Sequence, residues 1–184
     1  MRNSPLLDFS PRPSRRDAFR LLAGGAVAAA LWGTSPAGAA PIDLSRRATR
    51  VLLAKSARRL TLISGGQAIA QYGVGLGFAP EGHKLMSGDG RTPEGQYFIN
   101  RRNPRSEFYL SVGINYPSAA DVARARKLGV DPGGDIFIHG EPIRPDNRYG
   151  SGRDWTAGCI AVRNREIEEI WALVPDGTPI TITA

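Results

Sequence analysis

The sequence predicts a mainly β fold, a sandwich or barrel-like sheet with two short helices. Apolar and polar residues alternate in short segments separated by Gly, Pro, Asn and Asp, which is typical of strands joined by turns. The segments expected as strands are 49–55, 59–64, 67–74, 96–100, 108–114, 135–139, 159–162 and 178–183. Between the second and third of them, Gly65-Gly66 is a hairpin turn signal. With 184 residues, 41% of them hydrophobic, the chain suffices for one domain with a sizeable core.

Two segments carry helix signals instead. The first begins at Ser118 as a cap, has Asp121 at the capping-box position and ends before Gly129. In the second, residues 165–174, an apolar stripe repeats at helical spacing behind Asn164, which suits an N-cap. The stripe consists of Ile167, Ile170, Trp171 and Val174.

Two of the expected strands each carry one reactive side chain. His139 is one of two histidines and Cys159 is the only cysteine, and the loop between them is rich in Pro, Gly, Asn and Arg. Period-2 alternation puts Phe137 and His139 on one face of the first strand, and Cys159 and Ala161 on one face of the second. If the two strands are neighbours, the thiol and the imidazole can meet.

This pair suits acyl transfer through a thioester. A thiol becomes a strong nucleophile when a neighbouring imidazole takes its proton, so we expect Cys159 to be more acidic than a free cysteine, whose pKa is about 8.5. Gly158, without a side chain, lets backbone N–H groups near the nucleophile point at a developing oxyanion. The residues alone leave a second interpretation open, in which Cys159 is a small buried apolar residue and His139 a hydrogen-bonded structural one.

Four short motifs bear on this choice. They are His139-Gly140, Thr156-Ala157-Gly158-Cys159, Asn164 and Thr92-Pro93-Glu94-Gly95. Together they resemble the signature of the L,D-transpeptidases of the YkuD-like family, over roughly residues 49–184. The resemblance implies the YkuD-like β fold, with Cys159 as nucleophile and His139 as proton acceptor and donor. It further implies that the carbonyl of Gly140 orients the imidazole and that the N–H groups of Gly158 and Cys159 bind the oxyanion.

The resemblance also implies a substrate, the stem peptides of peptidoglycan, and no cofactor. Cys159 would attack the carbonyl between the L-centre of meso-diaminopimelate and the terminal D-Ala, releasing D-Ala and leaving a thioester. An amine of a second stem peptide, or of a lipoprotein lysine, would resolve it. With water as acceptor, the same site would be an L,D-carboxypeptidase or an amidase that releases wall-bound lipoprotein.

The chain departs from the family pattern at two positions. The pattern often has His before the Gly-Cys and Arg two residues after the Cys, where this chain has Ala157 and Ala161. Arg163 lies four residues after Cys159, on the same face if the strand extends that far, and can replace the missing carboxylate clamp. Other substrate-binding candidates are the loop residues Arg144, Arg148 and Arg153, together with Thr156. These departures keep open a non-catalytic wall-binding module in which Cys159 is structural.

The first 39 residues resemble an export signal of the twin-arginine type. Arg15-Arg16 precedes an Ala-, Gly- and Leu-rich segment, and Ala37-Gly38-Ala39 is a small-x-small cleavage site. We therefore expect a signal peptide at 1–39, a linker at 40–48, a catalytic domain at 49–184, a periplasmic location and no membrane span after cleavage. A retained membrane anchor is the alternative, which several Gly and Pro residues in the apolar run disfavour.

Charge and composition constrain the partners. The net charge is +7, and residues 40–184 keep 19 Lys and Arg against 15 Asp and Glu. This surplus suits an anionic polymer such as the cell wall, and no motif indicates nucleic acid. A zinc site made from His83, Asp89 and His139 lacks a recognisable spacing, so we expect no metal. We expect His83, on the polar loop 77–95, to face solvent.

Overall fold

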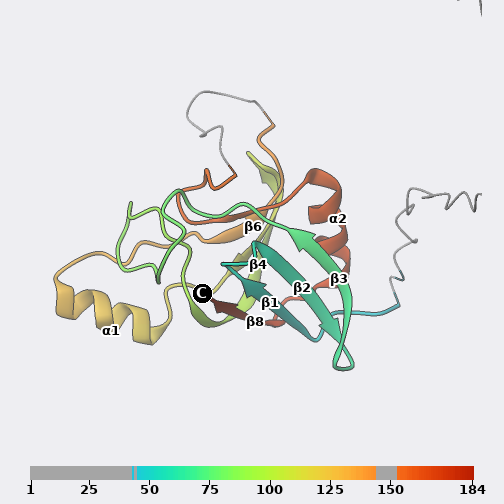
Figure 1. Ribbon diagram of the computed structural model, residues 1–184, viewed down its shortest axis with the longest axis horizontal. Helices are drawn as coiled ribbons and strands as arrows, with labels where there is room; N and C mark the ends of the chain where they lie inside the picture. The colour runs from blue at the N-terminus through green and yellow to red at the C-terminus, as the bar shows by residue number, and fades with distance from the viewer. Residues whose placement is uncertain (1–42, 44, 144–152) are drawn as a thin grey trace, which may run out of the picture. The chain divides into compact units, whose positions relative to one another are not determined.

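The computed structural model describes residues 43, 45–143 and 153–184 (Figure 1). The predicted signal peptide and the loop residues Arg144 and Arg148 lie outside this part of the chain. Of the predicted linker, Ala48 is buried in the core. The described strands are β1 (Arg50–Ala54), β2 (Arg59–Ser64), β3 (Gln67–Gly73), β4 (Gly95–Ser106), β5 (Tyr109–Ile114), β6 (Phe137–His139), β7 (Ile160–Ala161) and β8 (Pro179–Thr183). The described helices are α1 (Ala119–Leu128) and α2 (Asn164–Leu173).

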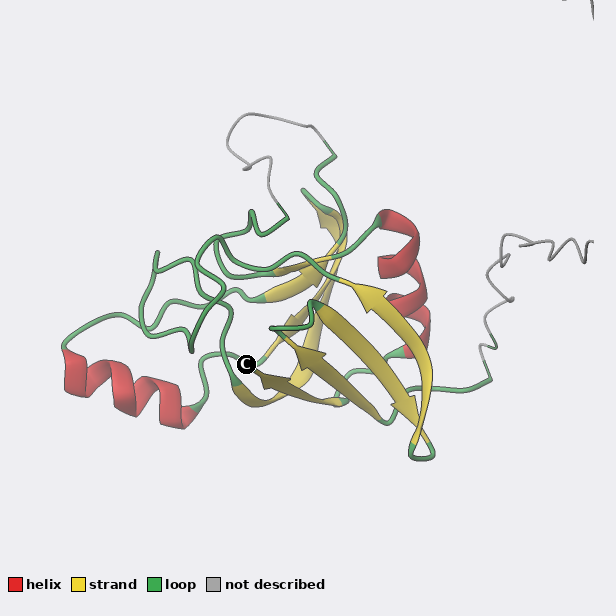
Figure 2. Cartoon of the chain, viewed as in Figure 1, coloured by secondary structure: helices red, strands yellow, loops and turns green. Residues whose placement is uncertain are grey.

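The described strands form one mixed sheet in the order β3-β2-β1-β8-β4-β5-β6-β7, which confirms the mainly β prediction (Figure 2). The C-terminal strand β8 lies inside the sheet, parallel to β1 and antiparallel to β4. The strands β6 and β7 are also parallel neighbours. Glycines at both turn positions between β2 and β3 have positive φ, 57° at Gly65 and 79° at Gly66, as the hairpin prediction requires.

The two ends of this strand order meet, which makes the sheet barrel-like. Gly75, just after β3, forms an antiparallel bridge with Ala161 of β7, and each N–H donates to the other's carbonyl at 2.9 Å. Only a glycine fits at position 75, because a Cβ there would lie 2.3 Å from the carbonyl oxygen of Arg153. Closure therefore places the chain around the cysteine against the chain that leaves β3.

The helices begin and end close to the predicted positions. Ser118 caps α1 and forms the capping box with Asp121, and Gly129 ends it at φ 68°. In α2 the N-cap is Arg163, so the role predicted for Asn164 was wrong: its side-chain oxygen instead accepts the N–H of Glu141 at 2.8 Å. The apolar stripe of α2 packs into the core. Of its members, Ile167, Ile170 and Val174 are buried and Trp171 is half-buried against the core, while Leu173, outside the predicted stripe, is buried as well.

Most strands differ from their predicted lengths by one or more residues, and for three of them the structure shows the cause. β4 has 12 residues, since it pairs first with β8 and then, beyond a register shift, with β5. β6 is shorter than 135–139 because Asp135 adopts φ 55°, outside the extended region. β7 has two residues because the chain turns into the N-cap of α2. Among the described residues, no helix is both long and apolar enough to cross a membrane.

Candidate active site

One face of the sheet carries two rows of side chains that run from β4 to β7. The rows follow from the strand register, since paired residues point to the same face. The first row is Arg101, Gly113, Phe137 and Cys159, and the second is Asn103, Ser111, His139 and Ala161. Cys159 precedes β7 by one residue and continues the first row, next to Phe137, whose N–H donates to its Sγ at 3.4 Å. The predicted neighbouring of the two strands is confirmed.

His139 and Cys159 line the same cavity, of about 270 Å³. The other lining residues are Asn103, Ser106, Glu107, Phe108, Ser111, Asp135 and Phe137. Both reactive side chains therefore open onto one space that a peptide group can enter. The sequence does not reveal this cavity, because its lining residues come from four strands or from the residues next to them.

The imidazole of His139 is held in one orientation. Its Nδ1 lies 2.7 Å from the carbonyl oxygen of Gly140, and a carbonyl only accepts, so Nδ1 carries the proton and Nε2 is left as the base. The Phe108 ring packs on the imidazole with 4.3 Å between centroids, and Trp155 meets it edge-on at 5.6 Å. A side chain at Gly140 would come within 2.5 Å of Asn164 Oδ1. The Gly140 carbonyl thus lies where the resemblance implied.

Burial keeps this pair neutral at rest. His139 is 2% exposed, and burial lowers its pKa to about 4, against the opposing hydrogen bond to Gly140. Burial also raises the pKa of Cys159, although the Phe137 N–H partly favours the thiolate. The surroundings of Cys159 therefore act against the acidic thiol that the sequence predicts. The thiol donates to the carbonyl of Asp135 at 3.4 Å, a contact that also favours the protonated sulfur.

The structure gives Thr156 and Gly158 roles other than the predicted ones. Thr156 is buried, and its hydroxyl donates to the carbonyl of Cys159 at 2.7 Å and accepts the N–H of Gly158 at 3.1 Å. That N–H is therefore engaged and cannot serve as the predicted oxyanion donor in this arrangement. Thr156 shapes the turn before Cys159 through these bonds, and its role in binding substrate stays a prediction. The N–H of Cys159 stays a prediction as oxyanion donor.

The predicted arginine clamp does not lie beside the nucleophile. Because β7 ends at Ala161, Arg163 leaves the strand face and is exposed at the start of α2. Arg163 and Arg153 line a second cavity, of about 450 Å³, whose lining does not include Cys159. Its other lining residues are Gly73, Val74, Gly75, Glu141, Trp155, Ala161 and Val162.

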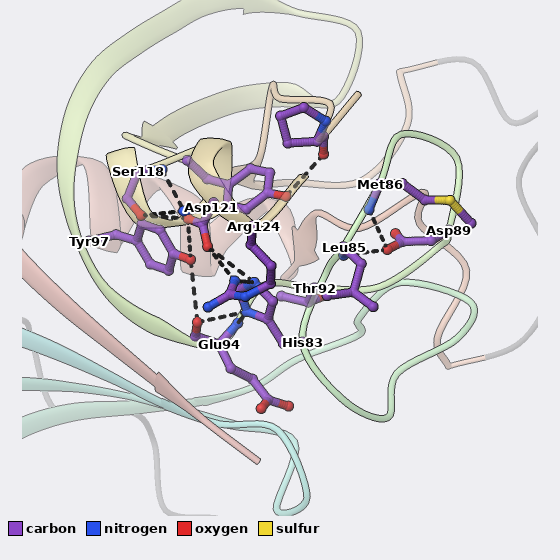
Figure 3. A network of polar contacts seen from close by, with 12 residues as sticks. His83, Leu85, Met86, Asp89, Thr92, Glu94, Tyr97, Ser118, Asp121 and Arg124 are labelled. Atoms are coloured by element: carbon purple, nitrogen blue, oxygen red, sulfur yellow. Dashed lines mark hydrogen bonds and ion pairs between the residues drawn. The ribbon is translucent and has the colours of Figure 1, made fainter. Parts of the chain in front are cut away.

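A polar network holds the loop that follows β3 (Figure 3). His83 Nδ1 accepts the N–H of Glu94 at 3.0 Å, and its Nε2 lies 3.1 Å from Asp121 Oδ1. The same Asp121 carboxylate caps α1 and accepts the hydroxyl of Tyr97 at 3.0 Å. His83 is therefore half-buried between the loop and α1. The expectation that it faces solvent was wrong, because tertiary packing supplies both ring nitrogens with partners.

A second part of this network supports the turn that precedes Cys159. Burial alone would raise the pKa of Asp89, but hydrogen bonds from Lys84 and from the N–H groups of Leu85, Arg91 and Met86 hold it at about 2. The turn so formed brings the Arg91 carbonyl to 2.7 Å from where a Cβ of Gly158 would lie. Gly158 has φ 134°, which a residue with a side chain rarely adopts. The loop that contains Arg91 and the turn at Gly158 are therefore packed closely against each other.

The match to known proteins decides the family. The model of the L,D-transpeptidase catalytic domain, YkuD, matches residues 48–182. This chain belongs to that family. No curated protein matches the L,D-transpeptidase chain described here.

Solved structures share the L,D-transpeptidase fold. The helical cell shape determining protein Pgp2 from Campylobacter jejuni is 24% identical over 73% of this chain, with TM-score 0.59, and a point mutant of it is 26% identical over 74%, with TM-score 0.57. Bd1075 from Bdellovibrio bacteriovorus is 27% identical over 76%, with TM-score 0.54. The matched regions cover 47% to 49% of those chains, so this L,D-transpeptidase domain spans about half their length.

Sequence reasoning missed several residues that shape the site. Phe108 packs on the His139 imidazole, yet in the sequence it resembles any strand aromatic. Asp154 accepts from Arg58 through both carboxylate oxygens and from the N–H of Leu76, which ties the segment before the nucleophile to the sheet. Arg101 reaches the Phe137 ring from β4. Of these residues, only Asp154 could have been noticed in the sequence, because it is a charged residue directly before Trp155 in the motif that contains Cys159.

Proposed function

We propose that this protein is a peptidoglycan L,D-transpeptidase that forms a thioester between Cys159 and a stem peptide. One observation carries the proposal: the imidazole of His139, oriented by the Gly140 carbonyl, lies in the same cavity as the Cys159 thiol. Membership of a family of L,D-transpeptidase catalytic domains supports the substrate class. The basic surplus of residues 40–184 suits an anionic wall polymer.

The reaction begins from the neutral pair. Sγ of Cys159 attacks the carbonyl between the L-centre of meso-diaminopimelate and the terminal D-Ala, and the thiol proton moves to Nε2 of His139. The imidazolium then gives this proton to the leaving amine of D-Ala, so that charge is balanced when the thioester forms. An amine of a second stem peptide or a lipoprotein lysine attacks the thioester and loses a proton to Nε2, which returns it to the sulfur.

Muropeptide mass spectrometry tests this proposal. Purified protein incubated with a disaccharide tetrapeptide should lose D-Ala and give a dimer joined through the acyl donor's diaminopimelate, with a transient adduct on Cys159. Cys159→Ser and His139→Ala are the matched controls, and both should show no adduct.

Two other outcomes would redirect the assignment. Loss of D-Ala with only a tripeptide product would identify water as the acceptor and the protein as a carboxypeptidase, and release of a wall-bound lipoprotein would identify an amidase. With no product and no adduct, including with a carbapenem as acylating probe, the site would be non-catalytic and the wall-binding module the better account.

A contribution to cell shape follows from the same proposal. A Pgp2 variant, named as a cell shape determining protein, is 26% identical to this chain. Trimming or cross-linking stem peptides changes how the wall is held together, so loss of this protein should alter cell curvature or length. Microscopy of a deletion strain complemented with wild type or with Cys159→Ser checks it, since a catalytic contribution is restored by the wild type alone.

Export is a proposal that rests on the N-terminal sequence. The Arg15-Arg16 pair and the Ala37-Gly38-Ala39 site support transport by the twin-arginine route to the periplasm, where peptidoglycan lies. N-terminal sequencing of the periplasmic protein should begin near Ala40. A full-length protein retained in the membrane fraction would contradict cleavage.

A further inference from the structure

The cavity that His139 and Cys159 share is rich in side-chain oxygen atoms. Besides these two residues and two phenylalanines, its described lining consists of Asn103, Ser106, Glu107, Ser111 and Asp135. Two of these side chains are carboxylates, and none of the described lining residues is Lys or Arg. Carboxylates only accept hydrogen bonds and carry negative charge. The lining therefore favours a ligand group that donates hydrogen bonds and is positively charged.

One hydroxyl group of this lining is buried and has no partner in the described part of the chain. Ser111 is 3% exposed, and its Oγ makes no hydrogen bond with another described residue. The Ser106 hydroxyl differs, because it accepts the N–H of Phe108 at 3.1 Å. Ser111 pairs with His139 across β5 and β6, so the two side chains stand side by side on the same face of the sheet. Ser111 thus presents a hydrogen-bonding group to whatever enters the cavity.

The two carboxylates of the cavity differ in their partners. Asp135 is paired with Arg101, whose Nη2 lies 3.0 Å from Oδ1. Glu107 is exposed, and its carboxylate has no ion-pair partner among the described residues. The backbone nevertheless fixes its position, because the Glu107 carbonyl accepts the N–H of Ile143 at 2.9 Å. Glu107 therefore supplies an unpaired negative charge at the exposed side of the cavity, and Ser111 supplies a hydroxyl at its buried side.

We infer that Ser111 and Glu107 bind the side-chain amino group of the diamino acid whose carbonyl Cys159 attacks, and so select donor peptides that carry this amine. This inference rests on the proposed function. An ammonium group has three donors and no acceptor, so it can bond the Ser111 hydroxyl and pair with the Glu107 carboxylate at the same time. Taking such a group out of water is costly unless it is paired and hydrogen-bonded, and the two oxygens supply both conditions.

The dimensions of the sheet and of the substrate agree. Ser111 lies two strands across and two residues along from Cys159. With strands about 4.8 Å apart and residues about 3.3 Å apart, the two Cα atoms are about 12 Å apart. In diaminopimelate, six bonds of about 1.5 Å join the attacked carbonyl carbon to the side-chain nitrogen and span about 7 to 8 Å when extended. The carbon–sulfur bond and a hydrogen bond of about 3 Å supply the rest of the distance between the two side chains.

The test compares four tetrapeptide donors that differ only at the attacked residue: meso-diaminopimelate, lysine, Nε-acetyl-lysine and norleucine. Lysine carries its amine as many bonds from the carbonyl as diaminopimelate does, acetylation removes the charge, and norleucine has no amine. Because D-Ala leaves during acylation, kcat/KM for its release does not depend on the acceptor. In the wild type this kcat/KM should be about 10- to 100-fold higher for the two peptides with a free amine, the worth of a hydrogen bond to a charged group.

Two substitutions remove the inferred contacts one at a time. Glu107→Gln and Ser111→Ala should each lower kcat/KM for the diaminopimelate and lysine peptides toward the value for norleucine, by about 10-fold. Glu81→Gln is the matched control: it removes an exposed carboxylate from a different cavity and should keep the full preference. If the wild type does not prefer the free amine, or if the preference survives both substitutions, the inference is overturned.

Stability separates this role from a structural one. Because the Ser111 hydroxyl bonds no described residue, Ser111→Ala should unfold at the wild-type temperature. Thermal unfolding followed by circular dichroism measures this. A variant that slows all four peptides by the same factor would give Ser111 a structural role and contradict the inference, since only a contact with the amine separates the peptides.

Binding distinguishes a failure of the proposed function from a failure of the inference. Calorimetry with Cys159→Ser, with and without Glu107→Gln, measures affinity for the lysine and norleucine peptides. If the wild type releases no D-Ala but Cys159→Ser prefers the lysine peptide through Glu107, the proposed function fails and the inference stands. If D-Ala is released regardless of the amine, the proposed function stands and the inference fails. The inference also fails if Cys159→Ser binds neither peptide or both equally.

Discussion

At the scale of single residues, burial shifts the two reactive groups toward their neutral forms. Charging either His139 or Cys159 costs solvation, so the pKa of the imidazole falls to about 4 and the pKa of the thiol rises. A site of this kind holds little thiolate, which makes the sulfur less prone to oxidation. The base is available over a wide range, because His139 stays neutral down to about pH 4.

The first prediction concerns the thiol. Alkylation of Cys159 by iodoacetamide should be slow at pH 7 and should rise with an apparent pKa above about 8.5, the value of a free cysteine, because burial disfavours the thiolate. Stopped-flow or mass-spectrometric alkylation rates between pH 6 and 11 measure it. A titration well below that value would show a resting thiolate–imidazolium pair and contradict the neutral pair.

The second prediction concerns His139 and stability. Its folded pKa, about 4, lies below the unfolded value of about 6.5, so the unfolded chain binds the extra proton between these two values. Stability should therefore be retained above pH 6.5 and fall as the pH drops toward 4, by up to about 3 kcal/mol. Urea unfolding of wild type and His139→Gln at several pH values checks it. An equal slope in both proteins would assign the loss to other groups.

The sequence was enough to identify the pair of His139 and Cys159, but not to predict the protonation states of their side chains. Period-2 alternation placed His139 and Cys159 on faces that can meet, and the short motifs indicated the family. The low pKa of the imidazole comes from burial, to which Phe108 and Trp155 contribute by packing on the ring, and neither contact can be read from the sequence. Arg163 failed as a clamp because the length of β7 is decided by where α2 begins.

At the scale of elements, the turn before Cys159 and the loop after β3 pack against each other as one unit. Gly77 pairs with Thr156, and the Arg91 carbonyl packs where Gly158 has no side chain. The sequence predicted each turn separately, through Thr92-Pro93-Glu94-Gly95 and through the Gly-Cys motif. It could not show their contact, because 64 residues separate Asp154 from Gly90 along the chain while the sheet brings the two turns together.

The third prediction tests this fit. Gly158→Ala should lower the free energy of unfolding by about 2 to 4 kcal/mol, because φ 134° is strained for alanine and the new Cβ would be 2.7 Å from the Arg91 carbonyl. Denaturant unfolding measures this cost. Gly66→Ala is the matched control: its φ is also positive, at 79°, but its Cβ would meet open space, so it should cost about 1 kcal/mol. Equal costs in both variants would show that the contact with Arg91 contributes nothing.

At the scale of the whole domain, a buried lysine joins the sheet to the loop that supports the site. Lys55, at the end of β1, is 2% exposed, and its ammonium group donates to the carbonyls of Gly82 and Thr92 and to Glu94 Oε1, at 2.5, 3.0 and 2.8 Å. The three acceptors lie along the loop that ends at β4. Composition alone would have left a lysine in solvent, since lysine is rarely buried unless it is paired.

The fourth prediction follows from this position. Lys55→Met keeps the length and apolar stem of the side chain but leaves a carboxylate and two carbonyls without their donor, so the protein should lose about 2 to 4 kcal/mol of stability. Because Glu94 is 25% exposed, the loss should lie toward the lower end of that range. Hydrogen exchange of the Leu85, Arg91 and Glu94 amides should accelerate as the loop loosens, and Cys159 alkylation should change with it, because the Arg91 carbonyl braces Gly158. Lys127→Met, exposed on α1, should leave all three measurements near wild type. Unchanged exchange in Lys55→Met would show that the Asp89 turn holds the loop without the lysine.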